Sequence, residues 1–151
     1  MSKYNNPLTQ QFKDWVICSF KHGAWAPVII FSIHIIAIFV FHVYDYFLSF
    51  DIPMHFIGGM AITYFFIESV ICAMNTQIIG RPSIIGLILI IFLLTCTTTI
   101  FWEFAEWIMD KVFLIHVQVS LEDTLLDMLL GILGGIVMIR IRFKNILKRT
   151  V

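Results

Sequence analysis

The sequence is poor in charge. Of its 151 residues, 13% are Asp, Glu, Lys or Arg, whereas 60% are hydrophobic. A soluble domain usually carries about 25% charged residues. Exposing this much apolar surface to water would be unfavourable, so the composition excludes a soluble globular domain and indicates a bilayer as the solvent. The Lys and Arg residues lie beside apolar runs and form no basic patch, which indicates membrane lipid and no nucleic acid as partner.

Cysteine is scarce, and we expect neither a cleavable leader nor internal repeats. None of Cys18, Cys72 and Cys96 falls at the acidic ends of the apolar runs, so we expect no disulfide framework. The first 22 residues are polar and mixed, without a short apolar region and a cleavage site, so the first span is expected to be an uncleaved anchor. No linker or low-complexity segment divides the chain, which predicts a single integral membrane domain over residues 1–151.

Long apolar runs make up most of the rest and predict an all-α, polytopic membrane protein. A helix needs about 20 predominantly apolar residues to cross the hydrocarbon. We expect a short interfacial amphipathic helix over residues 8–21, followed by four transmembrane helices over about residues 26–48, 53–74, 84–108 and 121–142.

The two ends of these spans differ in charge. With four spans, nine of the ten Lys and Arg residues face one side, and Lys111 alone faces the other. Cytoplasmic loops carry the excess of Lys and Arg. We therefore expect a multi-pass protein of the bacterial inner (cytoplasmic) membrane with both termini cytoplasmic. Eight of the ten Asp and Glu residues then face the outer side.

The acidic residues of the outer side follow helical spacing. Asp51 and His55 are four residues apart, as are Asp123 and Asp127, so each pair shares a helix face. The third span carries a polar stripe formed by Thr95, Thr99, Glu103, Glu106 and Asp110. The same end of the expected bundle also includes His42, Asp45 and Glu122.

Some of these residues also have a structural explanation. Asp51 can cap the second span, and Ser120 with Asp123 fits a capping box at the start of the fourth. Glu122 is favourable at the same helix N-terminus. For these three acids, capping and a role in a site both stay open.

Polar residues and glycines deeper in the spans are explained by helix contacts. His34 can hydrogen-bond a neighbouring helix, and Glu68 can snorkel to the surface or pair with Arg81. Gly59 of the second span allows another backbone to approach closely. Gly131 and Gly135 form a small-xxx-small packing surface on the fourth span.

Four residues resist such explanations because they lie about one turn inside the span ends: His55, Glu103, Glu106 and Asp127. A charge within the hydrocarbon costs about 2.5–3.5 kcal/mol on insertion scales. Neighbouring anions also repel, so either some are protonated or a cation lies among them. Carboxylates with an imidazole suit Mg²⁺, Mn²⁺, Ca²⁺ or iron. The predicted metal ligands are Asp51, His55, Glu103, Glu106, Asp123 and Asp127.

Three segments together resemble the YjdF-type bacterial inner-membrane proteins: Asp51 to Gly59, Trp102 to Trp107 and Asp123 to Met128. Their order (D-xxx-H, a mid-span Glu, then D-xxx-D followed by Gly) is more loosely similar to the VanZ-like proteins, named for a teicoplanin-resistance protein. The resemblance implies a polytopic helical membrane protein and supplies no reaction.

Three functions stay open. The first is an enzyme that acts on a lipid or lipid-linked envelope substrate, with His55 or Glu106 as the general base and a metal held by the other acids. The second is a non-catalytic protein of the VanZ-like resistance or immunity type that binds a lipid, an envelope-active peptide or a partner, since four spans leave little room for a substrate cavity. The third is a proton or cation pathway along the polar stripe.

Overall fold

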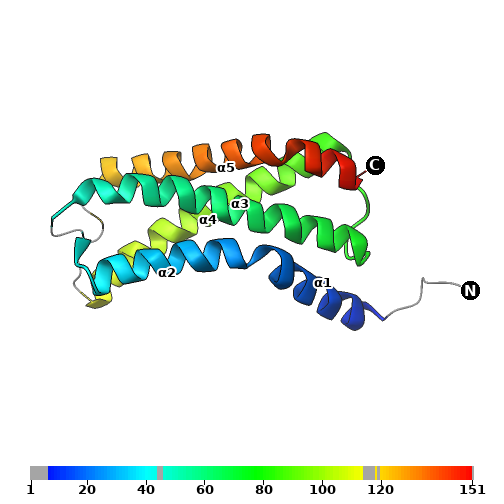
Figure 1. Cartoon of the computed structure of the whole chain (residues 1–151), viewed down its shortest axis with the longest axis horizontal. Coiled ribbons are helices and arrows are strands. Elements are labelled where there is room, and N and C mark those ends of the chain that lie inside the picture. Colours follow the sequence, from blue (N-terminus) through cyan, green and yellow to red (C-terminus); the bar gives the residue numbers. More distant parts are fainter. Residues whose placement is uncertain (1–6, 44–45, 114–117, 119, 151) are drawn as a thin grey trace, which may run out of the picture.

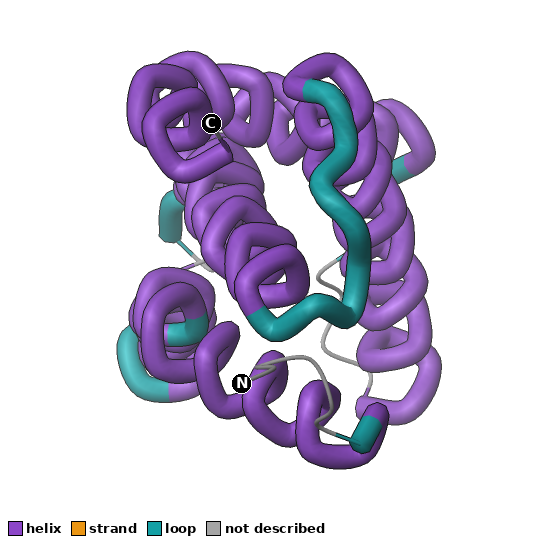
Figure 2. Tube along the Cα trace, turned by 90° about the vertical axis from the view of Figure 1, so that its right-hand side faces the viewer, coloured by secondary structure: helices purple, strands orange, loops and turns teal. Residues whose placement is uncertain are grey.

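The computed structural model describes residues 7–43, 46–113, 118 and 120–150. All regular structure in these segments is helical, which confirms the all-α prediction. The elements are α1 (Leu8–Gly23), α2 (Trp25–Phe39), the short 3₁₀ helix η2 (Leu48–Phe50), α3 (Asp51–Asn75), α4 (Ile84–Phe113) and α5 (Leu121–Thr150). Along the long axis, α3 and α5 run in one direction and α4 returns in the other (Figure 1). Figure 2 views the end at which α5 finishes and a loop connects α3 to α4.

Three helices, α3, α4 and α5, are long and apolar enough to cross a membrane. Helix α2 has 15 residues, and at about 1.5 Å per residue it is shorter than the roughly 30 Å of hydrocarbon. It meets the requirement only together with α1, and the two are bent by 58°. The structure therefore has three spans, or four if this bent pair crosses as one.

Helix α2 ends at Phe39, short of the predicted end near residue 48. The N–H of Phe41 donates to Ile36 O, five residues back, and His42 adopts a left-handed φ of 47°. The C-cap Val40 is still right-handed, so the left-handed residue turns the chain away only after the helix has ended. No glycine or proline marks this point in the sequence, so the apolar pattern gave no stop signal. Tyr44 and Asp45, which were expected at the outer surface, lie outside the described residues.

Helix α3 lies at the centre of the bundle. Its most apolar stretch is 56% buried, compared with 22% for those of α4 and α5. Towards the end of α3, one apolar core joins three helices through Ile67, Val70, Ile71, Met74, Leu87, Ile91 and Ile146. The outer faces of α4 and α5 expose many large apolar side chains, as expected of surfaces that contact lipid.

Glycines bring α3 and α5 into direct backbone contact. A Cβ on Gly59 would overlap the carbonyl of Gly131, and a Cβ on Gly134 would overlap the carbonyl of Phe56. A Cβ on Gly135 would press on Thr95 and Thr63. The predicted close approach at the glycines is confirmed, and it is what brings the acidic starts of α3 and α5 together.

Helix α1 packs along the last turns of α3. The side chain of Trp15 donates through Nε1 to Ser69 O at 3.1 Å, and Ser19 Oγ donates to Ser69 Oγ at 3.1 Å. Gly23 lies against the backbone of Phe65. The predicted amphipathic helix thus exists, with its polar and small residues used to contact α3.

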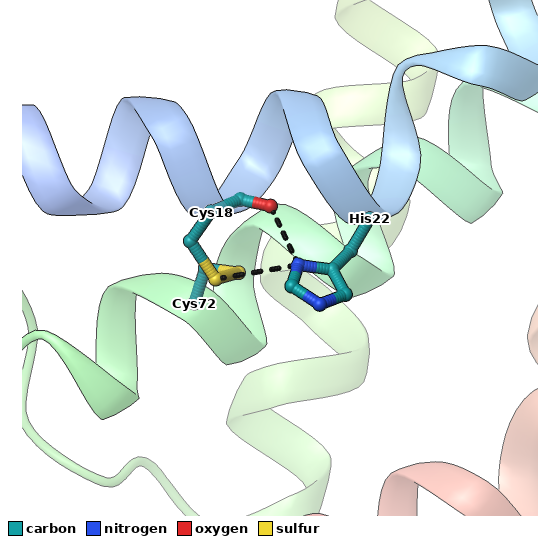
Figure 3. A group of neighbouring side chains, drawn as sticks. All are labelled: Cys18, His22 and Cys72. Carbon is teal, nitrogen blue, oxygen red and sulfur yellow. Dashed lines mark hydrogen bonds between the residues drawn. A yellow bond between two sulfur atoms is a disulfide. The ribbon is translucent and has the colours of Figure 1, made fainter.

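The packing of α1 on α3 also brings two cysteines together. Cys18 and Cys72 have Cα atoms 5.9 Å apart and form a disulfide (Figure 3). His22 lies beside it, with Nδ1 2.9 Å from Cys18 O and 3.7 Å from Cys18 Sγ. The expectation of no disulfide was therefore wrong. It rested on membrane sides and redox compartment, whereas the contact depends on how α1 folds back on α3. Cys96 is a free thiol.

Candidate functional site

The start of α3 places His55 among four carboxylates. Its Nε2 lies 3.2 Å from Asp51 Oδ1 on the preceding turn and 3.8 Å from Glu106 Oε1 on α4. Its Nδ1 lies 3.7 Å from Glu103 Oε1 on α4. The Nε2 atom also lies 3.9 Å from Asp127 Oδ2 on α5. We call these five residues the acidic/His cluster; three helices contribute to it.

The acidic/His cluster is shielded from the surroundings. The exposed fraction of its residues ranges from 2% for Glu106 to 8% for Asp51 and His55. Neither carboxylate oxygen of Glu103 has a hydrogen-bond partner among the described residues, and the same holds for His55 Nε2. Buried polar atoms normally have such partners. The oxygens of this buried carboxylate are therefore free to accept a hydrogen bond or to bind a cation.

One imidazole cannot balance four carboxylates. If all four carboxylates were ionised and His55 protonated, the buried cluster would still have a net charge of −3. Such a group must take up protons or a cation. Oxygen and nitrogen atoms of Asp51, His55 and Asp127, and likewise of His55, Glu103 and Glu106, lie within 4.8 Å of one another. Both sets are close enough to converge on one ion.

Trp102 holds one of the carboxylates in position. Its Nε1 donates to Glu106 Oε1 at 2.8 Å, one turn apart on α4. No role for Trp102 in the site was predicted from the sequence, although the spacing of four residues between Trp102 and Glu106 is a visible signal for such a contact.

Other acids of the same end lie in different surroundings. Asp123 belongs to neither convergent set, and its backbone N–H donates to Ser120 Oγ at 3.1 Å, which is the capping arrangement. Glu122 is exposed in the first turn of α5. Asp110 accepts a hydrogen bond from the backbone N–H of Gln118 at 2.9 Å. The structure thus brings together five of the six predicted ligands, and Asp123 serves the helix start instead. His42, also expected near this site, is exposed and belongs to neither set.

A cavity of about 420 Å³ opens beside the acidic/His cluster. His55 forms part of its wall, together with His34 of α2 and Trp102 of α4. The rings of His34 and Trp102 pack edge to face, with centroids 5.8 Å apart. Most of the remaining lining is apolar: Pro27, Val28, Ile30, Phe31, Met54, Gly58, Gly59, Ile62, Thr98, Thr99 and Gly131. Four spans were expected to leave little room for a cavity. Helix α2 forms one wall of the cavity, and the small residues Gly58, Gly59 and Gly131 line it on α3 and α5.

Below the acidic/His cluster, the polar stripe becomes a set of hydroxyl contacts. Thr63 Oγ1 and Thr95 Oγ1 lie 2.8 Å apart between α3 and α4. Thr63 Oγ1 also lies 2.7 Å from Gly59 O, and Thr95 Oγ1 lies 3.0 Å from Ile91 O. Because a hydroxyl has one proton, one threonine donates to the other and the second donates to its backbone carbonyl. Thr99 donates to Cys96 O. These hydroxyls satisfy one another and the backbone, so they stabilise the helix contacts below the site.

Known proteins place the chain in a family. Residues 15–146 match the family described as "Predicted membrane protein (DUF2238)". This chain belongs to that family. The match confirms the YjdF-type resemblance, whereas the VanZ-like one finds no support. An uncharacterised protein of Thermotoga maritima is 32% identical over 108 residues, or 68% of this chain and 52% of the relative. The chain therefore spans about half the length of this curated relative. No solved structure matches the chain.

Proposed function

We propose that this membrane protein is an enzyme that uses a divalent cation to act on a lipid or lipid-linked envelope substrate. The observation that carries the proposal is the position of His55. This residue is at once the centre of the four carboxylates and part of the wall of an apolar cavity of about 420 Å³. Pockets for small ligands measure about 300–1,000 Å³ and are mostly apolar, with a few polar groups.

The ligand set favours a hard cation. Carboxylate oxygens with one imidazole suit Mg²⁺, Mn²⁺, Ca²⁺ or iron, whereas a structural zinc site usually contains thiolates. The cation would be held by Asp51, Glu103 and Asp127, together with whichever of His55 and Glu106 does not act as the general base. The unpartnered oxygens of Glu103 support this assignment, because a cation offers the interaction that they lack.

The substrate would place its hydrocarbon in the cavity and its polar group at the acidic/His cluster. A bound cation supplies Lewis acidity towards a phosphoryl or carbonyl oxygen. Glu106, oriented by the indole N–H of Trp102, would accept the proton of the attacking nucleophile as general base. His55 is the other group within reach for this role. The cavity wall would exclude bulk water around the reacting group.

The sidedness is part of the proposal. The distribution of Lys and Arg favours the bacterial inner membrane with both termini cytoplasmic, which directs the acidic/His cluster to the outer leaflet. A proton or cation pathway is less favoured, because Glu68, the acid in the second half of α3, forms ion pairs with Arg142 and Arg149.

Elemental analysis of the purified protein tests the cation. We expect about one divalent ion per chain in the wild type, and loss of it in Glu103→Gln and Asp127→Asn. Glu122→Gln is the matched control, because this acid is exposed at the same end of α5. A metal content that is zero in the wild type, or equal in all four proteins, contradicts a metal site.

Lipid conversion tests the reaction. The metal-loaded protein, in neutral detergent, is incubated with a mixture of bacterial membrane lipids and products are followed by mass spectrometry. We expect a conversion that Glu106→Gln abolishes and Glu122→Gln retains. A metal-binding protein that retains lipid but converts none would instead be a non-catalytic lipid-binding protein.

A further inference from the structure

A second pocket lies at the other end of the bundle, about 20 Å along α3 from His55, judged by the helical rise. It has a volume of about 390 Å³ and lies between the last turn of α1, the second half of α3 and the last turns of α5. The residues of its wall that matter here are His22, Tyr64, Glu68, Arg142, Lys148 and Arg149. Neither the acidic/His cluster nor the apolar cavity includes any of them.

Glu68 holds two guanidinium groups in place. Arg142 Nη2 donates to Glu68 Oε1 at 2.6 Å, and Arg149 Nη1 donates to Glu68 Oε2 at 2.7 Å. The carboxylate is 3% exposed, so its position is set by the packing of α3. The guanidinium of Arg142 also lies over the ring of Tyr64, 5.1 Å from its centroid. The expected partner of Glu68, Arg81, does not lie in this pocket.

The pocket keeps an excess of positive charge after these contacts. Three cationic side chains, Arg142, Lys148 and Arg149, face one carboxylate, which leaves two positive charges. Each guanidinium has five N–H donors, and Glu68 accepts one hydrogen bond from each guanidinium. Arg142 Nε is buried without a hydrogen-bond partner among the described residues. The pocket therefore offers fixed donors and net positive charge to an anion.

We propose that this pocket binds a phosphate group at the membrane surface, with Glu68 as a positioning residue for the two arginines. Guanidinium groups match the oxygen geometry of phosphate through paired N–H donors. The pocket lies beside the last turns of α5, and Trp25 packs on Tyr64 with ring centroids 5.3 Å apart, as aromatic residues do at membrane interfaces. The headgroup of an anionic phospholipid and a soluble phosphate ester carry the same recognised chemistry.

Binding of two probes to the full chain in a neutral, phosphate-free detergent tests this inference. The probes are a short-chain phosphatidylglycerol and inorganic phosphate, each titrated by calorimetry. We expect saturable binding of at least one probe. Loss of one charged donor in Lys148→Gln or Arg149→Gln should weaken it at least about tenfold, or about 1.4 kcal/mol. Both side chains are exposed, so the variants are expected to fold.

Lys144→Gln is the matched control, because Lys144 is an exposed lysine of the same helix outside the pocket. Its affinity should equal that of the wild type. Saturation by the lipid alone assigns the site to a headgroup, and saturation by both probes assigns it to the phosphate group itself. If neither probe saturates, or if Lys144→Gln weakens binding as much as Arg149→Gln, the attraction is diffuse and the inference is wrong.

Discussion

Replacement of Glu103 by Gln should change the thermal stability in opposite directions with and without a divalent cation. The side chain is 6% exposed, and both of its oxygens lack hydrogen-bond partners among the described residues. Gln keeps the volume and removes one negative charge from a group of four. Without metal, the variant should therefore be more stable than the wild type, because like charges no longer repel.

With metal, the order should reverse. At a free cation concentration of about 100 times Kd, binding stabilises the wild type by about 2.7 kcal/mol. For a chain of this size this corresponds to a rise in Tm of about 5–10 °C. A buried contact to a charged group contributes up to about 3 kcal/mol, so the variant should bind about 100-fold more weakly. At the same concentration its stabilisation falls to about 0.4 kcal/mol, or roughly 1 °C.

The assay is thermal unfolding in detergent, followed by intrinsic tryptophan fluorescence, with a chelator or with Mg²⁺, Mn²⁺, Ca²⁺ or Fe²⁺. Glu122→Gln serves as control and should respond to the cation as the wild type does, because this side chain is exposed. A wild-type Tm that no cation raises, or an equal rise in Glu103→Gln, would refute a cation in the acidic/His cluster.

Three further changes test other parts of the structure. Glu68→Gln should lower the stability by about 1–3 kcal/mol, measured by thermal unfolding, because it removes a buried carboxylate that binds two partly exposed arginines; an unchanged Tm would contradict the ion pairs. Gly59→Ala should destabilise by about 1–3 kcal/mol through overlap with the backbone of α5. The neighbouring Gly58→Ala, with nothing within 4 Å of its added Cβ, should have little effect in the same assay. Alkylation under non-reducing conditions should label one cysteine in the wild type and two in Cys72→Ser, because the latter frees Cys18; three labelled thiols in the wild type would show that the disulfide does not form.

The order of the site residues along the helices could be predicted from the sequence. A spacing of four residues places Asp51 one helical turn before His55 on the same face. Spacings of three and four residues align the stripe that contains Glu103 and Glu106. Apolar runs of sufficient length showed that these residues start or end spans. Both signals are local, so one chain suffices to find them.

Contacts between distant segments could not be predicted in the same way. Glu68 was expected to snorkel or to pair with Arg81, yet it binds two arginines more than 70 residues further along the chain. The Cys18–Cys72 disulfide depends on α1 folding back on α3. In both cases the partner is chosen by packing, which leaves no periodic trace in the sequence. The end of α2 at Phe39 was missed for another reason, because no glycine or proline marks it.

The sequence by itself determined that the protein is helical and lies in a membrane, because charge is scarce and apolar runs are long enough to span the hydrocarbon. It also determined which acids share a helix face, since that follows from the pitch of the helix alone. Only the tertiary structure decided that five of these residues meet around His55, that Asp123 does not join them, and that a cavity opens beside them. The reason is that the rotation and separation of the helices depend on the close contact of Gly59 with Gly131, which sets how α3 and α5 face each other.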